Sequence, residues 1–184
     1  MANKVRFGLS NLYVCTYTVG AGGTVTLGTP YHQAGAVNLS LDAESDSKDF
    51  FADNTKYWSG YSDNGYTGKL ETALFDDEFK TQFLGYRQTA TGGLAQIKGA
   101  TKPTVALIFQ FEGDEAARRV ILYNVSLGAI TEEYATTEDT TEPQTESLDF
   151  TATGDNATGI VKAVYDSESQ SYATMFTAPP IPAL

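Results

Sequence analysis

The sequence predicts a mainly β fold with one helix and a long hairpin arm, and three observations lead to this prediction. Apolar and polar residues alternate over several short segments, which is typical of half-buried strands. The 17 glycines, 11 tyrosines and 10 phenylalanines favour strands joined by turns. Helical periodicity is confined to one short segment that begins at residue 76.

The first part of the chain contains three predicted β segments. Residues 4–9 alternate between polar and apolar side chains, as a half-buried strand does. Residues 12–28 contain two β-rich runs separated by Gly20-Ala21-Gly22-Gly23, which predicts a hairpin. That turn lacks the third glycine, the following helix and the lysine of a phosphate-binding loop. Residues 37–41 show the clearest alternation in the chain.

Residues 42–66 differ in character from the strands on either side. The first twelve positions hold five acidic residues, and a structureless loop of this length is uncommon in a domain. Six aromatic residues argue against disorder, because disordered segments are poor in them. They are Phe50, Phe51, Tyr57, Trp58, Tyr61 and Tyr66. We therefore predict an extended hairpin arm, followed by a returning strand at 66–74.

Two interpretations of the aromatic arm remain open at this point. Phe50, Phe51 and Trp58 could fold back over a sheet of their own domain, or the arm could cover a neighbouring molecule. Tyrosine and tryptophan are enriched where proteins meet, so we favour the second interpretation. The expected assembly residues are Asp49, Phe50, Phe51, Asp53, Asn54, Tyr57, Trp58 and Tyr61.

The only predicted helix spans Asp76–Leu84. Its first turn carries Asp76, Asp77 and Glu78, the charge that a helix N-terminus favours. Phe75, Phe79 and Phe83 recur every four residues and form one apolar stripe, and Gly85 is a typical residue for ending a helix. Since consecutive helical residues do not share a face, capping explains the three acids better than a metal site.

Further strands are predicted in the second half of the chain. After a glycine- and threonine-rich connection at 86–102, alternating residues at 105–111 and 120–125 indicate a hairpin turned at 113–115. Residues 135–145 have little to bury and are expected to be exposed. Two more strands, at 148–150 and 160–165, are joined through a turn at 154–156, and the C-terminal prolines oppose regular structure.

Composition excludes several classes of function. The net charge of −11 argues against a protein that grips nucleic acid, which needs a basic surface. One cysteine and one histidine leave no disulfide, zinc ribbon or multi-histidine metal site. Cys15 lies in an apolar run, as a buried residue would, and the acids at 42–53 do not follow the EF-hand order. We expect no enzyme, no cofactor and no metal, and a soluble protein made in a cytoplasm.

The order of several longer segments resembles one family. FFADNTKYW, NGYTGKLE and TEPQTESLDF follow one another as they do in the major tail proteins of long-tailed bacteriophages, of the phi13 type. The resemblance covers roughly residues 3–165 and fades over 166–184. It places one domain at 1–166, with the arm at 42–66 and the helix at 76–84, followed by a C-terminal extension at 167–184.

This resemblance implies a tail tube protein. Its fold would be a β-sandwich or flattened barrel with one flanking helix, and six copies would close into a ring. Stacked rings would form a hollow tube that conducts double-stranded DNA to the host without binding it. The implied partners are further copies, a tape-measure protein, and tail-terminator and baseplate proteins. The implied location is the virion tail, assembled in the bacterial cytoplasm, with no membrane contact.

Three other functions fit the sequence less well. The same fold could serve in the tube of a contractile or secretion machine. A carbohydrate-binding β-sandwich could use Tyr57, Trp58 and Tyr61 as a sugar platform. A capsid decoration protein would bind phage heads and would not assemble with itself.

Overall fold

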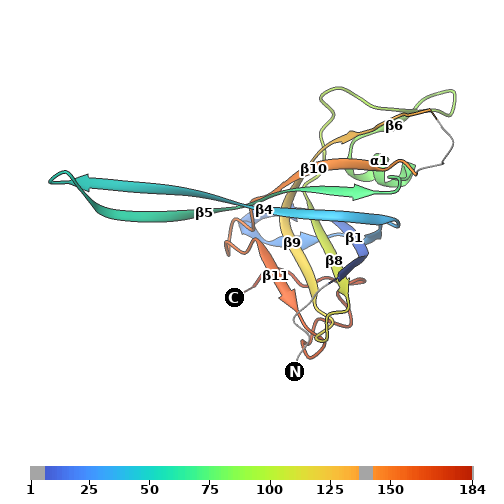
Figure 1. Cartoon of the computed structure of the whole chain (residues 1–184). Coiled ribbons are helices and arrows are strands. Elements are labelled where there is room, and N and C mark those ends of the chain that lie inside the picture. Colours follow the sequence, from blue (N-terminus) through green and yellow to red (C-terminus); the bar gives the residue numbers. More distant parts are fainter. Residues whose placement is uncertain (1–6, 137–142, 184) are drawn as a thin grey trace.

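A computed structural model describes residues 7–136 and 143–183 as a β body with one helix and a long projecting arm (Figure 1). The 3-10 turn η1 covers Ala21–Gly23 and the helix α1 covers Asp77–Phe83. The strands are β1 (Phe7–Val19), β2 (Val25–Leu27), β3 (Tyr31–His32), β4 (Ala36–Ala52), β5 (Thr55–Thr72), β6 (Arg87–Gln88), β7 (Leu94–Ala95), β8 (Val105–Glu112), β9 (Arg119–Thr131), β10 (Glu146–Ala152) and β11 (Lys162–Tyr165).

One antiparallel sheet of nine strands forms the body, in the order β2-β1-β8-β9-β10-β5-β4, with β3 added to β1 and β11 to β9. The short link between β3 and β4 keeps the two ends of this sheet together. Within it, the Gln33 backbone N–H donates to the Leu12 carbonyl at 2.9 Å, and the Gln33 side chain donates to the Leu74 carbonyl at 3.0 Å. The sheet therefore curls into a flattened, incompletely closed barrel, as predicted.

Helix α1 closes this barrel with its phenylalanine stripe. Phe75, Phe79 and Phe83 are buried in one core with side chains of β1, β5, β8, β9 and β10. The ring centroids of Phe75 and Phe79 lie 4.9 Å apart, and those of Phe79 and Phe83 lie 5.3 Å apart. Asp76 caps the helix by accepting the Phe79 N–H at 2.9 Å, and Gly85 follows with a φ of +73°. The predicted helix, its stripe and both of its ends are confirmed.

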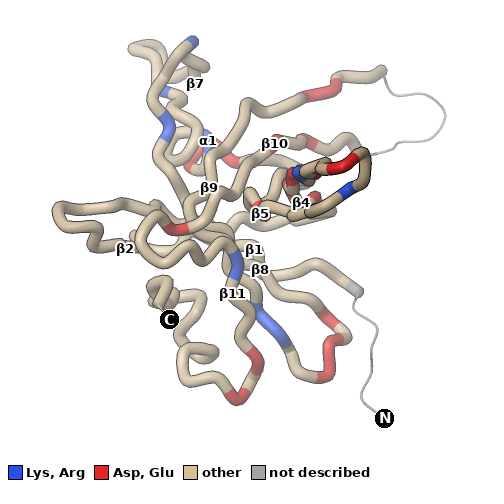
Figure 2. Tube along the Cα trace, turned by 90° about the vertical axis from the view of Figure 1, so that its left-hand side faces the viewer, with Lys and Arg blue, Asp and Glu red and all other residues tan. Residues whose placement is uncertain are grey.

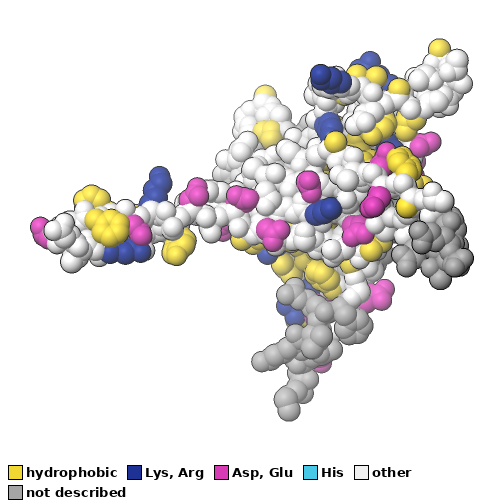
Figure 3. All heavy atoms as spheres, turned by 45° about the horizontal axis from the view of Figure 1, so that its top comes forward, with side chains coloured by type: hydrophobic (Ala, Val, Ile, Leu, Met, Phe, Trp, Pro, Cys, Tyr) yellow, Lys and Arg dark blue, Asp and Glu magenta, His cyan; other side chains and the backbone are white. Residues whose placement is uncertain are grey.

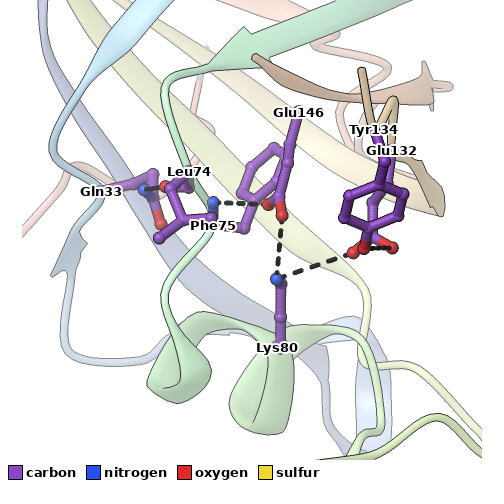
Figure 4. Close-up of polar contacts among 7 residues, drawn as sticks. All are labelled: Gln33, Leu74, Phe75, Lys80, Glu132, Tyr134 and Glu146. Atoms are coloured by element: carbon purple, nitrogen blue, oxygen red, sulfur yellow. Dashed lines mark hydrogen bonds and ion pairs between the residues drawn. The ribbon is translucent and has the colours of Figure 1, made fainter. Parts of the chain in front are cut away.

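An ion cluster built on the largely buried pair of Lys80 and Glu146 fixes the position of α1 (Figure 4). The Lys80 ammonium lies 3.2 Å from Glu146 on β10 and 3.8 Å from Glu132, which follows β9. Glu146 also accepts the backbone N–H of Phe75 at 2.8 Å, at the start of the helical region. Removing one partner of such a buried pair leaves the other charge uncompensated, so the cluster holds the helix in one place.

A second core covers the outer face of the sheet. Alternation along β8 suggested one buried face, but Ala106 and Ile108 on its other face are buried as well. Residues 166–183 run across this face in a series of turns, and Met175 is fully buried beneath them. The Arg119 guanidinium lies 3.8 and 4.1 Å from the ring centroids of Tyr172 and Phe176. The C-terminal prolines do oppose regular structure, yet their segment packs on the body.

The predicted N-terminal strands, the hairpin at 12–28 and the connection at 135–145 can each be compared with the structure. The two strands expected at 4–9 and 12–19 are one strand in their described part, β1, which is irregular near Asn11 at a φ of 52°. The hairpin at 12–28 is confirmed, because β1 pairs with β2 around η1. In the connection expected to be exposed, residues 135, 136, 143 and 144 are exposed, and 137–142 lie outside the described residues.

Candidate functional site

The arm is a continuation of β4 and β5 beyond the rest of the sheet (Figure 1). These strands pair along their length, to the Ala52–Thr55 pair at the tip. Strand β10 pairs with β5 only as far as Tyr66, so residues 44–64 project without a third strand. Asp53 and Asn54 form the turn with φ values of 50° and 57°, a conformation that Asp and Asn tolerate better than most residues. The predicted hairpin arm is confirmed.

The arm residues expected to serve assembly include five exposed aromatic side chains. Phe50 is 59% exposed and Trp58 is 56% exposed, and neither belongs to a core cluster. Phe51, Tyr57 and Tyr61 are more exposed still. The structure therefore does not place these aromatics over their own sheet. Monomeric soluble proteins rarely expose contiguous apolar side chains in this way unless the patch serves an interaction.

Aromatic side chains occupy both faces of the arm. Phe50 pairs directly with Trp58, so both lie on one face, where the Phe50 and Tyr57 rings meet edge to face at 6.5 Å. The pairing register between β4 and β5 shifts by one residue between Phe50 and Phe51. Phe51 and Tyr61 lie on the opposite face of the arm from Phe50 and Trp58. The arm therefore presents a contact surface on each side.

Two local contacts hold the arm side chains in place. An ion pair of 2.8 Å links Asp49 on β4 to Lys56 on β5, across the face that carries Phe51. On the other face, the Trp58 indole lies over Gly60, where the methyl group of an alanine would come within 2.4 Å of the ring. Glycine at this position lets the indole lie flat along the strand. The arrangement separates Trp58 from Tyr61, which argues against a flat sugar platform built from both.

The arm strands also carry unpaired edges. The outer edge of β4 and the edge of β5 beyond Tyr66 have no partner strand among the described residues. Unpaired edges readily accept another chain, and charged residues on them limit indiscriminate pairing. Strand β4 carries Asp42, Glu44, Asp46 and Asp49 along this stretch. Figure 3 shows acidic and hydrophobic side chains side by side on the arm.

The remaining candidates from the sequence have structural explanations. Asp76 is the helix cap, and Gly20 and Ala21–Gly23 turn the β1–β2 hairpin. Cys15 is buried in the second core, and burial raises the pKa of its thiol to about 12. Within residues 7–136 and 143–183, no group of three His, Cys, Asp or Glu side chains could hold a metal ion. Helix α1 is too short to cross a membrane, and no other described helix is long and apolar enough to do so.

One surface feature was missed at the sequence level. No acidic residue occurs between Glu78 and Glu112, a stretch that holds four of the 12 basic residues. Within it, residues 86–102 form a long connection that contains the β6–β7 hairpin. We call residues 86–102 the basic end. Arg87 and Lys98 are exposed there and form no ion pair with the described residues. A plot of charge along the chain would have revealed this segment. Figure 2 shows basic residues, in blue, along the part of the chain near β7.

Comparison with known proteins identifies the fold. No family model matches the chain, and no curated protein matches it. Among solved structures, the cap of the anti-feeding prophage, a tube-terminating cap, matches with a TM-score of 0.54 at 10% identity, covering 91% of this chain and 95% of that one.

Two further matches come from an extracellular contractile injection system called PVC. A chain of its sheath-tube complex matches with a TM-score of 0.52 at 7% identity, covering 89% of this chain and 93% of that one. A chain of its sheath/tube terminator matches with a TM-score of 0.51 at 8% identity, covering 84% and 93%. At such identities the likeness concerns the fold alone. The protein has a tail-tube-like fold, a mainly β architecture shared with chains of phage-like contractile injection systems.

Proposed function

We propose that the protein is a structural subunit of a tail tube, assembling into six-membered rings that stack into a hollow conduit for DNA. The observation that carries the proposal is the arm: a two-stranded projection with five exposed aromatic side chains on a body of tail-tube-like fold. Its projecting part, residues 44–64, contributes nothing to the core of its own chain, whereas Tyr66 at its base packs against that core. Buried against another copy, the projecting part supplies the apolar contact that assembly requires.

The assembly residues of the proposal are those of the arm tip. Phe50, Phe51, Tyr57, Trp58 and Tyr61 provide apolar area on both faces. Asp53 and Asn54 form the turn, and Asp49 ties the two strands together through Lys56. An arm with aromatics on both faces suits insertion between two neighbouring surfaces. The further partners of the proposal are tape-measure, terminator and baseplate proteins.

The charge of the chain agrees with a conduit. A tube wall of net negative charge does not attract the phosphates of DNA. A DNA duplex can therefore slide through the lumen without binding to the wall. Curling of the sheet leaves edge strands at its two ends, and a closed ring would let each edge pair with the next subunit. The proposed location is the tail of a virion.

The particular machine has two candidates. The segments quoted from the sequence favour a long-tailed phage of the phi13 type. The solved structures that share the fold belong to contractile injection systems, which favours the tube of such a machine. A contractile tube is surrounded by a sheath. Co-purification of a sheath protein with assembled tubes from the native source would therefore decide for the contractile machine.

The experiment is negative-stain microscopy of the purified protein over a range of concentrations, with tail-assembly partners added where needed. Rings and tubes are expected, and Trp58 provides a second measurement because it is the only tryptophan. Its emission should shift to shorter wavelengths as the exposed indole becomes buried. A protein that stays monomeric by light scattering under all these conditions would refute the proposal. A fluorescence change caused by saccharides would instead support a carbohydrate-binding module.

A further inference from the structure

The charges of the arm and of the basic end are complementary. The arm, residues 42–66, holds six acidic residues and two lysines, a net charge of −4. The basic end, residues 86–102, holds Arg87, Lys98 and Lys102 and no acidic residue, a net charge of +3. Both segments project from a chain of net charge −11, in which a cluster of unopposed positive charge is unusual. Complementary charge of this kind selects and orients a protein contact.

The basic end also has an apolar hollow. A surface hollow of about 490 Å³ lies between the end of α1 and the segment after β7, and it includes the apolar side chains of Leu84, Ile97, Ala100 and Ala129. Gln96, Lys98, Gly99 and Lys102 also line it. Ile97 is 44% exposed at this surface. A volume of this size lies within the range of cavities that bind small ligands, and it can receive an aromatic side chain.

A second hollow beside the β6–β7 hairpin has acidic side chains in its lining. Asp77 and Glu78 of α1 line it together with Gln88 and Leu94. Those two carboxylates repel an acidic partner. Lys102 donates to the carbonyls of Leu127 and Gly128, which fixes its ammonium beside the hollow. Arg87 and Lys98 are thus the cations free to meet a carboxylate.

The arm cannot reach the basic end of its own chain. Figure 1 shows the arm leaving the body in one direction and β6 lying at the far end of the molecule. Figure 3 shows basic side chains gathered with hydrophobic ones at that far end. We propose that the arm of one copy docks on the basic end of a second copy, with an arm aromatic in the hollow and arm carboxylates beside Arg87 and Lys98. Such a head-to-tail contact generates a closed ring or an open filament.

This inference rests on the proposed function and identifies the receptor surface for the arm. Two charge-reversed proteins test it. The first reverses the basic end through Arg87→Glu and Lys98→Glu. The second reverses the arm through Glu44→Lys, Asp46→Lys and Asp63→Lys, which are exposed positions away from the tip turn. Each protein alone brings like charges together at the contact, whereas a mixture restores opposite charges in both combinations.

Assembly is followed by light scattering and Trp58 emission against protein concentration, with folding checked by circular dichroism. Each reversed protein alone should need at least a tenfold higher concentration to assemble. Their equimolar mixture should assemble near the wild-type concentration, a rescue that misfolded proteins could not give. The matched control reverses three exposed acids outside the arm, Glu133, Asp149 and Glu168, to lysine and should assemble as the wild type does.

Three results would overturn the inference. They are wild-type assembly by either reversed protein alone, a mixture as unassembled as its components, and an equal loss in the control. In each case tubes of the wild-type protein would leave the proposed function intact. Failure of the wild-type protein to assemble at all would refute the proposed function instead.

Discussion

Removing the arm should abolish assembly and leave the fold in place. Asp46 and Ser62 face each other across the hairpin, so an Asn-Gly turn can replace residues 47–61 and join them directly. No residue of that stretch belongs to either core cluster. Surface changes of this kind alter the free energy of unfolding by about 0.5 kcal/mol, and loop length contributes only about 0.6 kcal/mol per doubling. The shortened protein should unfold within about 1 kcal/mol of the wild type.

The effect on assembly should be much larger. A large aromatic side chain offers about 200 Å² for burial, and more than half of Phe50 and of Trp58 is exposed, at 59% and 56%. Burying about 100 Å² of each at about 25 cal/mol per Å² stabilises a contact by about 2.5 kcal/mol per side chain. Losing both would cost about 5 kcal/mol and weaken each contact several-thousand-fold, and every joint of a ring would lose the same amount.

Thermal unfolding and negative-stain microscopy of the shortened protein test this reasoning together. Single variants Phe50→Ala and Trp58→Ala should reduce assembly, and Tyr134→Ala is the matched control because Tyr134 is an exposed aromatic outside the arm. Intact folding with lost tubes agrees with the reasoning. Unfolding of the shortened protein, together with normal tubes from both single variants, would mean that the arm belongs to its own core.

Three more predictions concern the body and the tube. Phe79→Ala should lower the free energy of unfolding in urea by about 3–5 kcal/mol, because the ring is fully buried between Phe75 and Phe83; a change below 1 kcal/mol would contradict this packing. Burial raises the pKa of the Cys15 thiol to about 12, so a thiol reagent at pH 8 should react only after unfolding, and equal rates with and without denaturant would contradict it. Because the folded pKa exceeds the unfolded one, this thiol's contribution to stability is complete below pH 9 and is lost as the pH rises towards 12. Finally, the inward-facing side chains of an assembled tube should be mostly acidic, and a lumen dominated by lysine and arginine in a tube structure would exclude this arrangement.

Local sequence determined the elements whose geometry depends on neighbouring residues. The cap, stripe and end of α1 all lie within ten residues, because helical contacts join positions three or four apart. The arm was predicted from the length of residues 42–66 and from their six aromatic residues, which a disordered segment rarely contains. Its turn at Asp53 and Asn54 follows from the tolerance of these residues for positive φ.

Tertiary structure alone decided what lies on each face of the sheet. Leu122 and Val125 are three residues apart, so simple alternation would place them on opposite faces of β9. A bulge at Asn124, with a φ of 52°, adds one residue to the strand and brings both side chains to the same face. The second core depends on Met175 reaching β8 and β9 from a segment without regular structure, and no local period records such a contact. The direction of the arm away from the basic end is likewise a property of the curled sheet. Sequence supplied both charges, and only the fold placed them on opposite sides, where the two segments of one chain cannot meet.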